Sequence, residues 1–172
     1  MRFVDFKTAD LSDVHREGVQ VADDVFRSFG LKTRFCGEVV TVKVFEDNVL
    51  VKRELEQPGS GKVLVVDGGG SRRVALMGDQ LAALALENGW EGVVIYGCIR
   101  DSADINAMKV GVRALGTHPF KSVKRGEGSR QQRLDFAGVA FRPGAFLYAD
   151  EDGILLTDKP LHEYGSEEAK FF

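Results

Sequence analysis

The chain has 172 residues, of which 44% are hydrophobic and 28% charged, and its formal net charge is −3. This length and composition are typical of a globular domain, so we expect one domain over residues 1–172 with a polar tail from about residue 162. Sequence-independent binding of nucleic acid requires a basic face, and the acidic balance therefore predicts no direct nucleic-acid partner.

The first half of the chain alternates between helix and strand patterns. We expect a helix over residues 9–19 with Asp10 or Ser12 as its N-cap, because both side chains can accept a backbone N–H. The β-branched run at 36–45 predicts a strand, and residues 46–61 predict a helix ended by Pro58 and Gly59.

The middle of the chain carries the clearest pattern. The apolar run KVLVVD, followed by three glycines, predicts a buried strand and a tight loop. The segment GDQLAALALENGW predicts a helix stopped by Gly89, and EGVVIYG predicts a second buried strand.

The last third of the chain predicts short strands. They fall within residues 110–120, 133–141, 145–150 and 153–157. Helix and strand alternate in the middle and strands dominate later, so we predict an α/β sandwich with a partly parallel sheet.

We expect a reducing, cytoplasmic compartment and no membrane contact. Cys36 and Cys98 are too few for a disulfide framework and lack C-x-x-C spacing. The N-terminal residues have no apolar signal segment, and no apolar run approaches the roughly 20 residues of a membrane helix.

Charged residues follow the second buried strand directly, as Arg100 and Asp101. If the middle of the chain is a right-handed strand–helix–strand crossover, the glycine loop and the start of the helix at Gly78 and Asp79 lie at the same sheet edge. Ligands of α/β sheets usually bind at such an edge. We therefore expect Asp79 and Asp101 to face one another across a pocket.

The chemistry of that pocket would suit a keto acid. The N–H groups of Gly78, Asp79, Gln80 and Leu81 lie at the positive end of the helix dipole and can bind a carboxylate. Arg100 can hold a second oxyanion, and carboxylates are the oxygen ligands that Mg²⁺ or Mn²⁺ accept. A cation and an arginine together would stabilise an enolate.

The residues alone leave other interpretations open. Asp79 in the first turn of a helix can be a partner of the helix dipole, and Arg100–Asp101 can be a solvated surface turn. Cys98 has no activating base nearby, which favours a small core residue over a nucleophile. The scattered histidines lack metal-ligand spacing.

Four longer stretches identify a family resemblance over roughly residues 8–161. The chain resembles the family that contains the regulator of ribonuclease E activity A and the class II aldolases for 4-hydroxy-4-methyl-2-oxoglutarate. The resemblance lies in FGLKTRFCGEVVTVKVFEDN, GKVLVVDGGGSRRVALMGD, NGWEGVVIYGCIRD and LYADEDGILLT.

The resemblance implies a fold, an assembly and a site. The fold would be the β/β/α sandwich of swivelling phosphohistidine-like domains, in homotrimers or hexamers with sites between subunits. By resemblance, Asp101 would hold a divalent metal, Asp79 would order its water shell, and Arg100 would bind substrate and steady the enolate. Residues 78–81 would line the substrate carboxylate.

The resemblance implies two lyase reactions and one alternative. The reactions are cleavage of 4-hydroxy-4-methyl-2-oxoglutarate to pyruvate and decarboxylation of oxaloacetate. Details such as FEDN and DGGGS resemble the regulator branch. Members of that branch lack the complete motif of an acidic residue followed later by Arg-Asp, which this chain keeps as Asp79 and Arg100–Asp101. The alternative is a protein-binding inhibitor of ribonuclease E, and a ligand-binding module without turnover is a third possibility.

The long aldolases carry a C-terminal extension that this chain does not match. A group from a neighbouring subunit would then be missing, which leaves the preferred substrate open.

Overall fold

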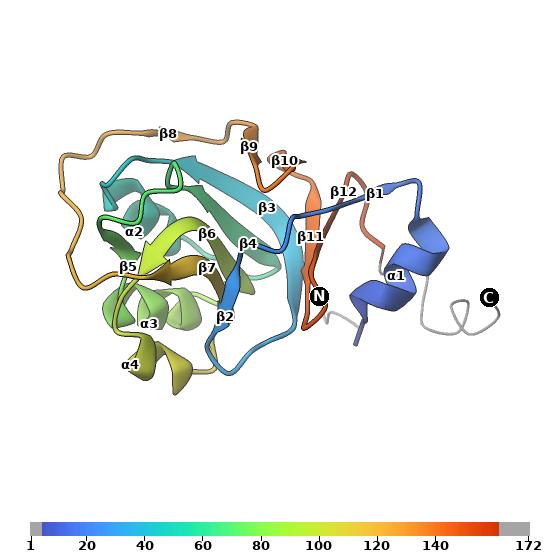
Figure 1. Ribbon diagram of the computed structural model, residues 1–172, viewed down its shortest axis with the longest axis horizontal. Coiled ribbons are helices and arrows are strands. Elements are labelled where there is room, and N and C mark those ends of the chain that lie inside the picture. The colour runs from blue at the N-terminus through green and yellow to red at the C-terminus, as the bar shows by residue number, and fades with distance from the viewer. Residues whose placement is uncertain (1–4, 162–172) are drawn as a thin grey trace.

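The computed structural model describes residues 5–161. The tail predicted from about residue 162 lies outside this range. Figure 1 shows the helices α2, α3 and α4 against one side of a large curved sheet. The helices are α1 (Thr8–His15), α2 (Val49–Leu55), α3 (Asp79–Glu87) and α4 (Ser102–Asn106). The strands are β1 (Val19–Val21), β2 (Arg27–Phe29), β3 (Phe35–Lys43), β4 (Lys62–Asp67), β5 (Ala75–Met77), β6 (Gly92–Ile99), β7 (Val112–Thr117), β8 (Ser129–Arg130), β9 (Leu134–Phe136), β10 (Val139–Phe141), β11 (Phe146–Ala149) and β12 (Ile154–Thr157).

The main sheet is partly parallel, as predicted. Its strand order is β1-β12-β11-β3-β4-β6-β7-β2. The four central strands β3, β4, β6 and β7 run parallel to one another, while β11, β12, β1 and β2 pair antiparallel. Each parallel connection crosses through a helix, so the carboxyl ends of β4 and β6 meet at one edge of the sheet.

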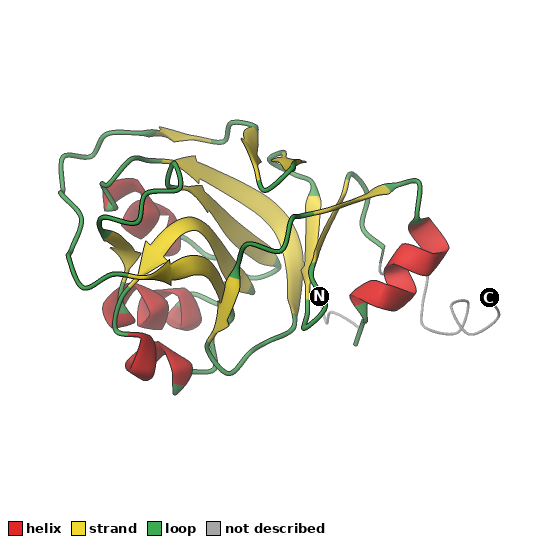
Figure 2. Ribbon diagram, in the orientation of Figure 1, coloured by secondary structure: helices red, strands yellow, loops and turns green. Residues whose placement is uncertain are grey.

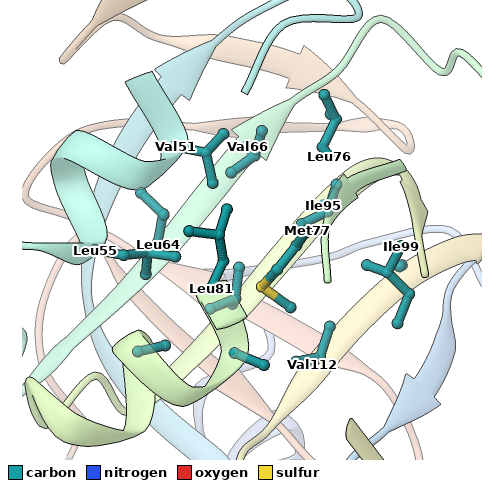
Figure 3. Packing of buried hydrophobic residues seen from close by; sticks show 14 of the residues in the cluster. Val51, Leu55, Leu64, Val66, Leu76, Met77, Leu81, Ile95, Ile99 and Val112 are labelled. Carbon is teal, nitrogen blue, oxygen red and sulfur yellow. The ribbon is translucent and has the colours of Figure 1, made fainter. Parts of the chain in front are cut away.

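The central strands are buried on both faces. Alternate residues of a strand point to opposite sides, so Leu64 and Val66 pack toward the helices while Val63 and Val65 pack on the other face. Figure 3 shows Leu64 and Val66 beside Val51 of α2. Each such side chain contributes about 1.5–3 kcal/mol of burial free energy.

A second layer of strands covers the face away from the helices. Phe136 of β9 and Phe141 of β10 belong to the same buried cluster as Val63 and Val65. Phe136 also stacks on Tyr96 of β6 with ring centroids 4.7 Å apart. Helices, central sheet and outer strands form the expected β/β/α layers, and Figure 2 shows the helices in red and the strands of both β layers in yellow.

The start of α1 differs from the prediction. Neither Asp10 nor Ser12 is the N-cap, because α1 begins at Thr8, and Ser12 Oγ instead donates to the Ala9 carbonyl at 2.8 Å. The carboxylate of Asp150 accepts the Thr8 N–H at 2.7 Å and the Thr8 hydroxyl at 2.6 Å. A side chain distant in sequence therefore fixes this helix start.

Helix α2 is shorter than the predicted segment 46–61. It ends at Leu55, and the Gln57 N–H then bonds the Glu54 carbonyl, so the helix stops before Pro58 is reached. The predicted helix at 78–90 is close to α3, which is followed by Gly89 with a φ of +77°. That left-handed conformation favours glycine at a helix end.

Several short elements were not predicted, namely β1, β2, β5, β8 and α4. The most important is β5, which lies between the glycine loop and α3. Ala75 pairs with Cys98 and Met77 with Ile99, so β5 runs parallel to the end of β6. This pairing places Gly78 beside Arg100.

Candidate active site

All six predicted site residues line one cleft. The cleft has a volume of about 730 Å³ and lies between α2, α3 and the chain segment 121–124. It is lined by Gly78, Asp79, Gln80, Leu81, Arg100 and Asp101, together with residues of α2. The crossover topology thus brings together the residues that the sequence pattern singled out, while their chemical roles stay predictions.

The tip of β6 is tied to the start of α3 by two hydrogen bonds. The Arg100 N–H donates to the Met77 carbonyl at 2.9 Å. The Asp79 N–H donates to Asp101 Oδ2 at 3.0 Å. Asp101 adopts a left-handed backbone conformation with a φ of 55°, which aspartate tolerates better than most residues. These bonds hold the Asp101 carboxylate at the positive end of α3.

Gly78 allows the close approach of Asp101 and Arg100. A Cβ atom placed on Gly78 would lie 2.6 Å from Asp101 Oδ2 and 3.5 Å from Arg100 Nε. Both side chains therefore lie directly against the Gly78 backbone. The half-buried Arg100 also donates from Nη1 to the Pro119 carbonyl at 3.4 Å.

The first turn of α3 offers backbone donors to the cleft. The first helical hydrogen bond runs from the Ala82 N–H to the Gly78 carbonyl at 3.0 Å. The N–H groups of Gln80 and Leu81 precede this bond and have no partner within the helix. Both residues line the cleft, so an anion bound there can accept a hydrogen bond from each of these two N–H groups.

The glycine loop, which was predicted to lie at the same sheet edge as the start of α3, does not line this cleft. Gly68–Gly70 lies at the same sheet edge, but it packs against other side chains. The N–H groups of Gly68 and Gly70 both donate to the Tyr96 carbonyl at 3.1 Å, and Gly69 lies close to the Phe45 ring. The insertion of β5 separates this loop from α3.

Several residues of the cleft were missed by the sequence analysis. Asn48, Lys52 and Arg53 come from α2 and the residue before it, and Lys121, Ser122 and Lys124 come from the segment after β7. No local motif marks them, because they reach the cleft only when α2 and this segment fold beside α3. They add positive charge to the region next to Arg100.

Asp47 anchors the segment that carries Ser122 and Lys124. Its buried carboxylate accepts the N–H groups of Arg125 at 2.9 Å, Glu127 at 3.2 Å and Val49 at 3.1 Å. Burial raises the pKa of Asp47, but these backbone hydrogen bonds outweigh burial and hold the pKa below its usual value. Asp47 thereby fixes one wall of the cleft.

Replacing Asp47 with asparagine is expected to lower the free energy of unfolding by roughly 2 kcal/mol at neutral pH, because three backbone N–H groups lose their charged acceptor. The pKa of Asp47 is lower in the folded protein than in the unfolded chain. Its contribution to the free energy of unfolding is therefore present above the unfolded pKa of about 3.9 and is lost as pH falls through the lower folded pKa. Urea unfolding of both proteins near pH 7 and near pH 3.5 measures this difference.

The exposed Asp13 of α1 provides a matched control for that experiment. Asp13→Asn is expected to change the free energy of unfolding by less than about 0.5 kcal/mol at either pH. A stability difference between wild type and Asp47→Asn that stays constant from neutral to acidic pH contradicts the assigned role of the carboxylate charge.

Cys98 is a buried core residue. It is 1% exposed, and burial raises the pKa of its thiol. Both observations agree with its predicted structural role. Within residues 5–161, no helix is long and apolar enough to cross a membrane.

Comparison with known proteins places the chain in a family. A family model described as RraA-like, Aldolase/RraA, matches residues 8–156. An Aromatoleum aromaticum protein named "Putative 4-hydroxy-4-methyl-2-oxoglutarate aldolase" is 54% identical over 92% of this chain and 99% of its own.

Two solved structures are also similar. A Geobacillus kaustophilus structure described as an S-adenosylmethionine:2-dimethylmenaquinone methyltransferase has a TM-score of 0.89 and 55% identity over 91% of this chain and 97% of its own. A Thermus thermophilis structure described as the RNA-processing inhibitor RraA has a TM-score of 0.88 and 48% identity, and the match covers 91% of this chain and 95% of the Thermus chain. The chain therefore belongs to the RraA-like, Aldolase/RraA family.

Proposed function

We propose that this protein is a divalent-metal-dependent lyase. It would cleave 4-hydroxy-4-methyl-2-oxoglutarate to pyruvate by a retro-aldol reaction and decarboxylate oxaloacetate through the same pyruvate enolate. The observation that carries the proposal is the hydrogen bond from the Asp79 N–H to Asp101 Oδ2 at 3.0 Å. It joins a carboxylate to a helix N-terminus in the cleft that Arg100 also lines. The aldolase name of the Aromatoleum relative supports the same reaction.

The donor set of the cleft fits a hydrated Mg²⁺ or Mn²⁺. The Asp101 side chain is exposed, and its Oδ1 accepts no hydrogen bond from residues 5–161. No group of three metal-ligating side chains gathers in that range, so the ion would keep several water ligands, as Mg²⁺ usually does. We propose Asp101 as the direct ligand and Asp79 as an acceptor for bound water. The bound ion would supply Lewis-acid stabilisation of negative charge.

The protein groups bind and orient the keto acid. The N–H groups of Gln80 and Leu81 donate to its carboxylate at the positive end of α3, and Arg100 donates to the keto oxygen. When the C4 hydroxyl loses its proton to water, the C3–C4 bond breaks and its electron pair forms the enolate of pyruvate. The C4 fragment leaves as a second pyruvate.

The enolate then takes a proton at C3 from water and becomes pyruvate. Arg100 stabilises the enolate oxygen, where negative charge is greatest in the transition state. Oxaloacetate reaches the same enolate when its C3–C4 bond breaks and carbon dioxide leaves. One oxyanion-stabilising cleft therefore serves both reactions.

Pyruvate release tests the proposal directly. With Mg²⁺ or Mn²⁺ present, the protein is expected to release pyruvate from 4-hydroxy-4-methyl-2-oxoglutarate and from oxaloacetate. A chelator such as EDTA should abolish release, and added metal should restore it, because the Lewis acid is then removed and returned. Coupling to lactate dehydrogenase measures the pyruvate formed.

Asp101→Asn is the matched control for that assay. Asparagine can still accept the Asp79 N–H but lacks the charge that a divalent cation needs, so metal-stimulated release should disappear while the fold persists. If neither substrate yields metal-stimulated pyruvate at high protein concentration, the lyase proposal fails.

The description of the Geobacillus structure suggests a different reaction. Methyl transfer to a dimethylmenaquinone requires a site for an apolar ring and for the methyl donor. Lys52, Arg53, Lys121 and Lys124 bring positive charge to the cleft next to Arg100. These cationic side chains favour an anionic substrate over an uncharged quinone, which supports the lyase.

A second candidate function is inhibition of ribonuclease E by protein–protein contact. The similarity to the Thermus structure described as an RNA-processing inhibitor favours it. Wild type and Asp101→Ala should be compared as inhibitors of that nuclease. Equal inhibition would place this activity on an outer surface, where it can coexist with the lyase cleft. Absence of inhibition by either protein would reject the candidate.

We also propose assembly as a homotrimer or hexamer with sites between subunits. Light scattering after size-exclusion chromatography measures the molar mass of the assembly, and a monomer would contradict this part of the proposal.

A further inference from the structure

Ser122 carries a buried hydroxyl without a hydrogen-bond partner. The residue is 4% exposed, and its Oγ contacts no donor or acceptor among residues 5–161. A buried hydroxyl left unpaired costs free energy, so native proteins rarely keep one without a reason. Ser122 nevertheless lines the same cleft as Arg100 and Asp101. A polar group of a bound ligand can supply the missing partner.

The chain segment around Ser122 runs beside the candidate active site. Lys121, its neighbour, pairs with Ala75 of β5 in a parallel bridge. The chain reaches Gly78 and the start of α3 directly after β5. On the other side, Arg100 Nη1 donates to the Pro119 carbonyl at 3.4 Å. Ser122 is thus placed next to the keto-acid site but outside it.

Lys124, two residues after Ser122, also lines the cleft, and its ammonium group is held in position. Lys124 Nζ donates to Asn48 Oδ1 at 2.8 Å. The Asn48 side chain is itself fixed, because its Nδ2 donates to the Leu76 carbonyl at 3.1 Å. An ammonium has three N–H donors, so Lys124 can donate to a ligand in the cleft as well.

The two glutamates that line the cleft lie at one of its ends. Asn48 and Asp79 mark the N-terminal ends of α2 and α3, while Glu56 and Glu87 mark the opposite ends. Both helices connect parallel strands on one face of the sheet, so their N-termini lie together. Glu56 and Glu87 therefore stand away from the end that carries Lys124, whereas Asp79 and Asp101 lie at that end beside Arg100.

We propose that Ser122 and Lys124 form a second anion subsite, which binds the distal carboxylate of a dicarboxylic 2-keto acid. This inference rests on the proposed lyase function and adds the groups that would select the substrate. The α3 N-terminus and Arg100 hold the keto-acid end. A cleft of about 730 Å³ has room for more than pyruvate, so both ends of such a substrate fit.

The subsite has a distinct kinetic signature. The distal carboxylate of 4-hydroxy-4-methyl-2-oxoglutarate keeps its charge throughout carbon–carbon cleavage. Groups that bind it act equally on the ground state and the transition state, so their loss should raise KM and leave kcat nearly unchanged. An effect on kcat alone would contradict the inference.

The test compares two substrates that differ only in that carboxylate. The second is 4-hydroxy-4-methyl-2-oxopentanoate, in which a methyl group replaces the distal carboxylate. Wild type should prefer the dicarboxylate in kcat/KM, and Ser122→Ala should reduce this preference by roughly 10-fold, since a hydrogen bond to a charged group is lost. The kcat/KM for the monocarboxylate should stay within about 2-fold of wild type.

Lys124→Met gives an independent variant on an exposed residue, and Lys109→Met, at an exposed lysine outside the cleft, is its control. Lys124→Met should reduce the preference as Ser122→Ala does, whereas Lys109→Met should keep it. The subsite is rejected if wild type shows no preference, or if both cleft variants lose activity equally on the two substrates.

Binding without turnover separates this inference from the lyase proposal. Titration calorimetry with 2-oxoglutarate and 2-oxopentanoate, at fixed Mg²⁺, compares a dicarboxylate with its methyl analogue. Tighter binding of 2-oxoglutarate that Ser122→Ala removes supports the subsite even if no pyruvate is ever released. Equal binding of the two ligands by wild type overturns the subsite even if the lyase activity is found.

Discussion

Replacing Arg100 with lysine is expected to lower kcat for pyruvate release by on the order of 100- to 1,000-fold. Lysine keeps the positive charge but loses the planar pair of donors that can hold two oxygens at once. The contact strengthens as charge develops on the enolate, so kcat should fall at least as much as KM rises. Steady-state kinetics with both keto acids measures the two effects.

A second readout isolates enolate formation from carbon–carbon cleavage. Exchange of the methyl protons of pyruvate in deuterated water, followed by NMR, should slow in Arg100→Lys to a similar degree. The fold should persist, because within residues 5–161 the Arg100 side chain makes only the long hydrogen bond to the Pro119 carbonyl. A variant with raised KM, unchanged kcat and normal exchange contradicts a role for Arg100 in the transition state.

The residues around α3 and β6 were predictable because their signals are local. The leucine- and alanine-rich run of α3 and the glycine after it define the helix, and the apolar run of β6 defines the strand. Right-handed crossover then places Asp79 and Asp101 at one edge. In the structure the Asp79 N–H donates to Asp101 Oδ2 at 3.0 Å, so the backbone of Asp79, and not its carboxylate, makes the contact with Asp101.

The remaining parts of the cleft depend on contacts that no local pattern encodes. Strand β5 is too short to show periodicity, and it forms because its residues are buried against β6. Ser122 looks like an ordinary loop residue in the sequence. It becomes a candidate only when burial removes water from its hydroxyl and the fold offers no partner. The same holds for the N-terminus of α1, which Asp150 fixes from a distant part of the chain.

Gly78→Ala is expected to lower kcat/KM for pyruvate release by on the order of 100-fold while the protein stays folded. The added Cβ would lie 2.6 Å from Asp101 Oδ2, which is closer than two such atoms can approach, so the carboxylate must move away. The φ of Gly78 is −119°, a value that alanine adopts without strain. The free energy of unfolding should fall by only about 1 kcal/mol, because alanine is a poorer N-cap than glycine.

Gly18→Ala is the matched control, because its added Cβ would have an ordinary contact of 3.7 Å with the His15 carbonyl oxygen. Gly18 lies between α1 and β1, on the opposite side of the molecule from α2 and α3 in Figure 1. Activity and thermal unfolding of this variant should match wild type. In Gly78→Ala the dependence of activity on Mg²⁺ concentration should also weaken, since the displaced carboxylate is the proposed metal ligand. If Gly78→Ala keeps full activity and an unchanged metal dependence, the position of the Asp101 carboxylate does not matter for turnover, and Asp101 loses its proposed role.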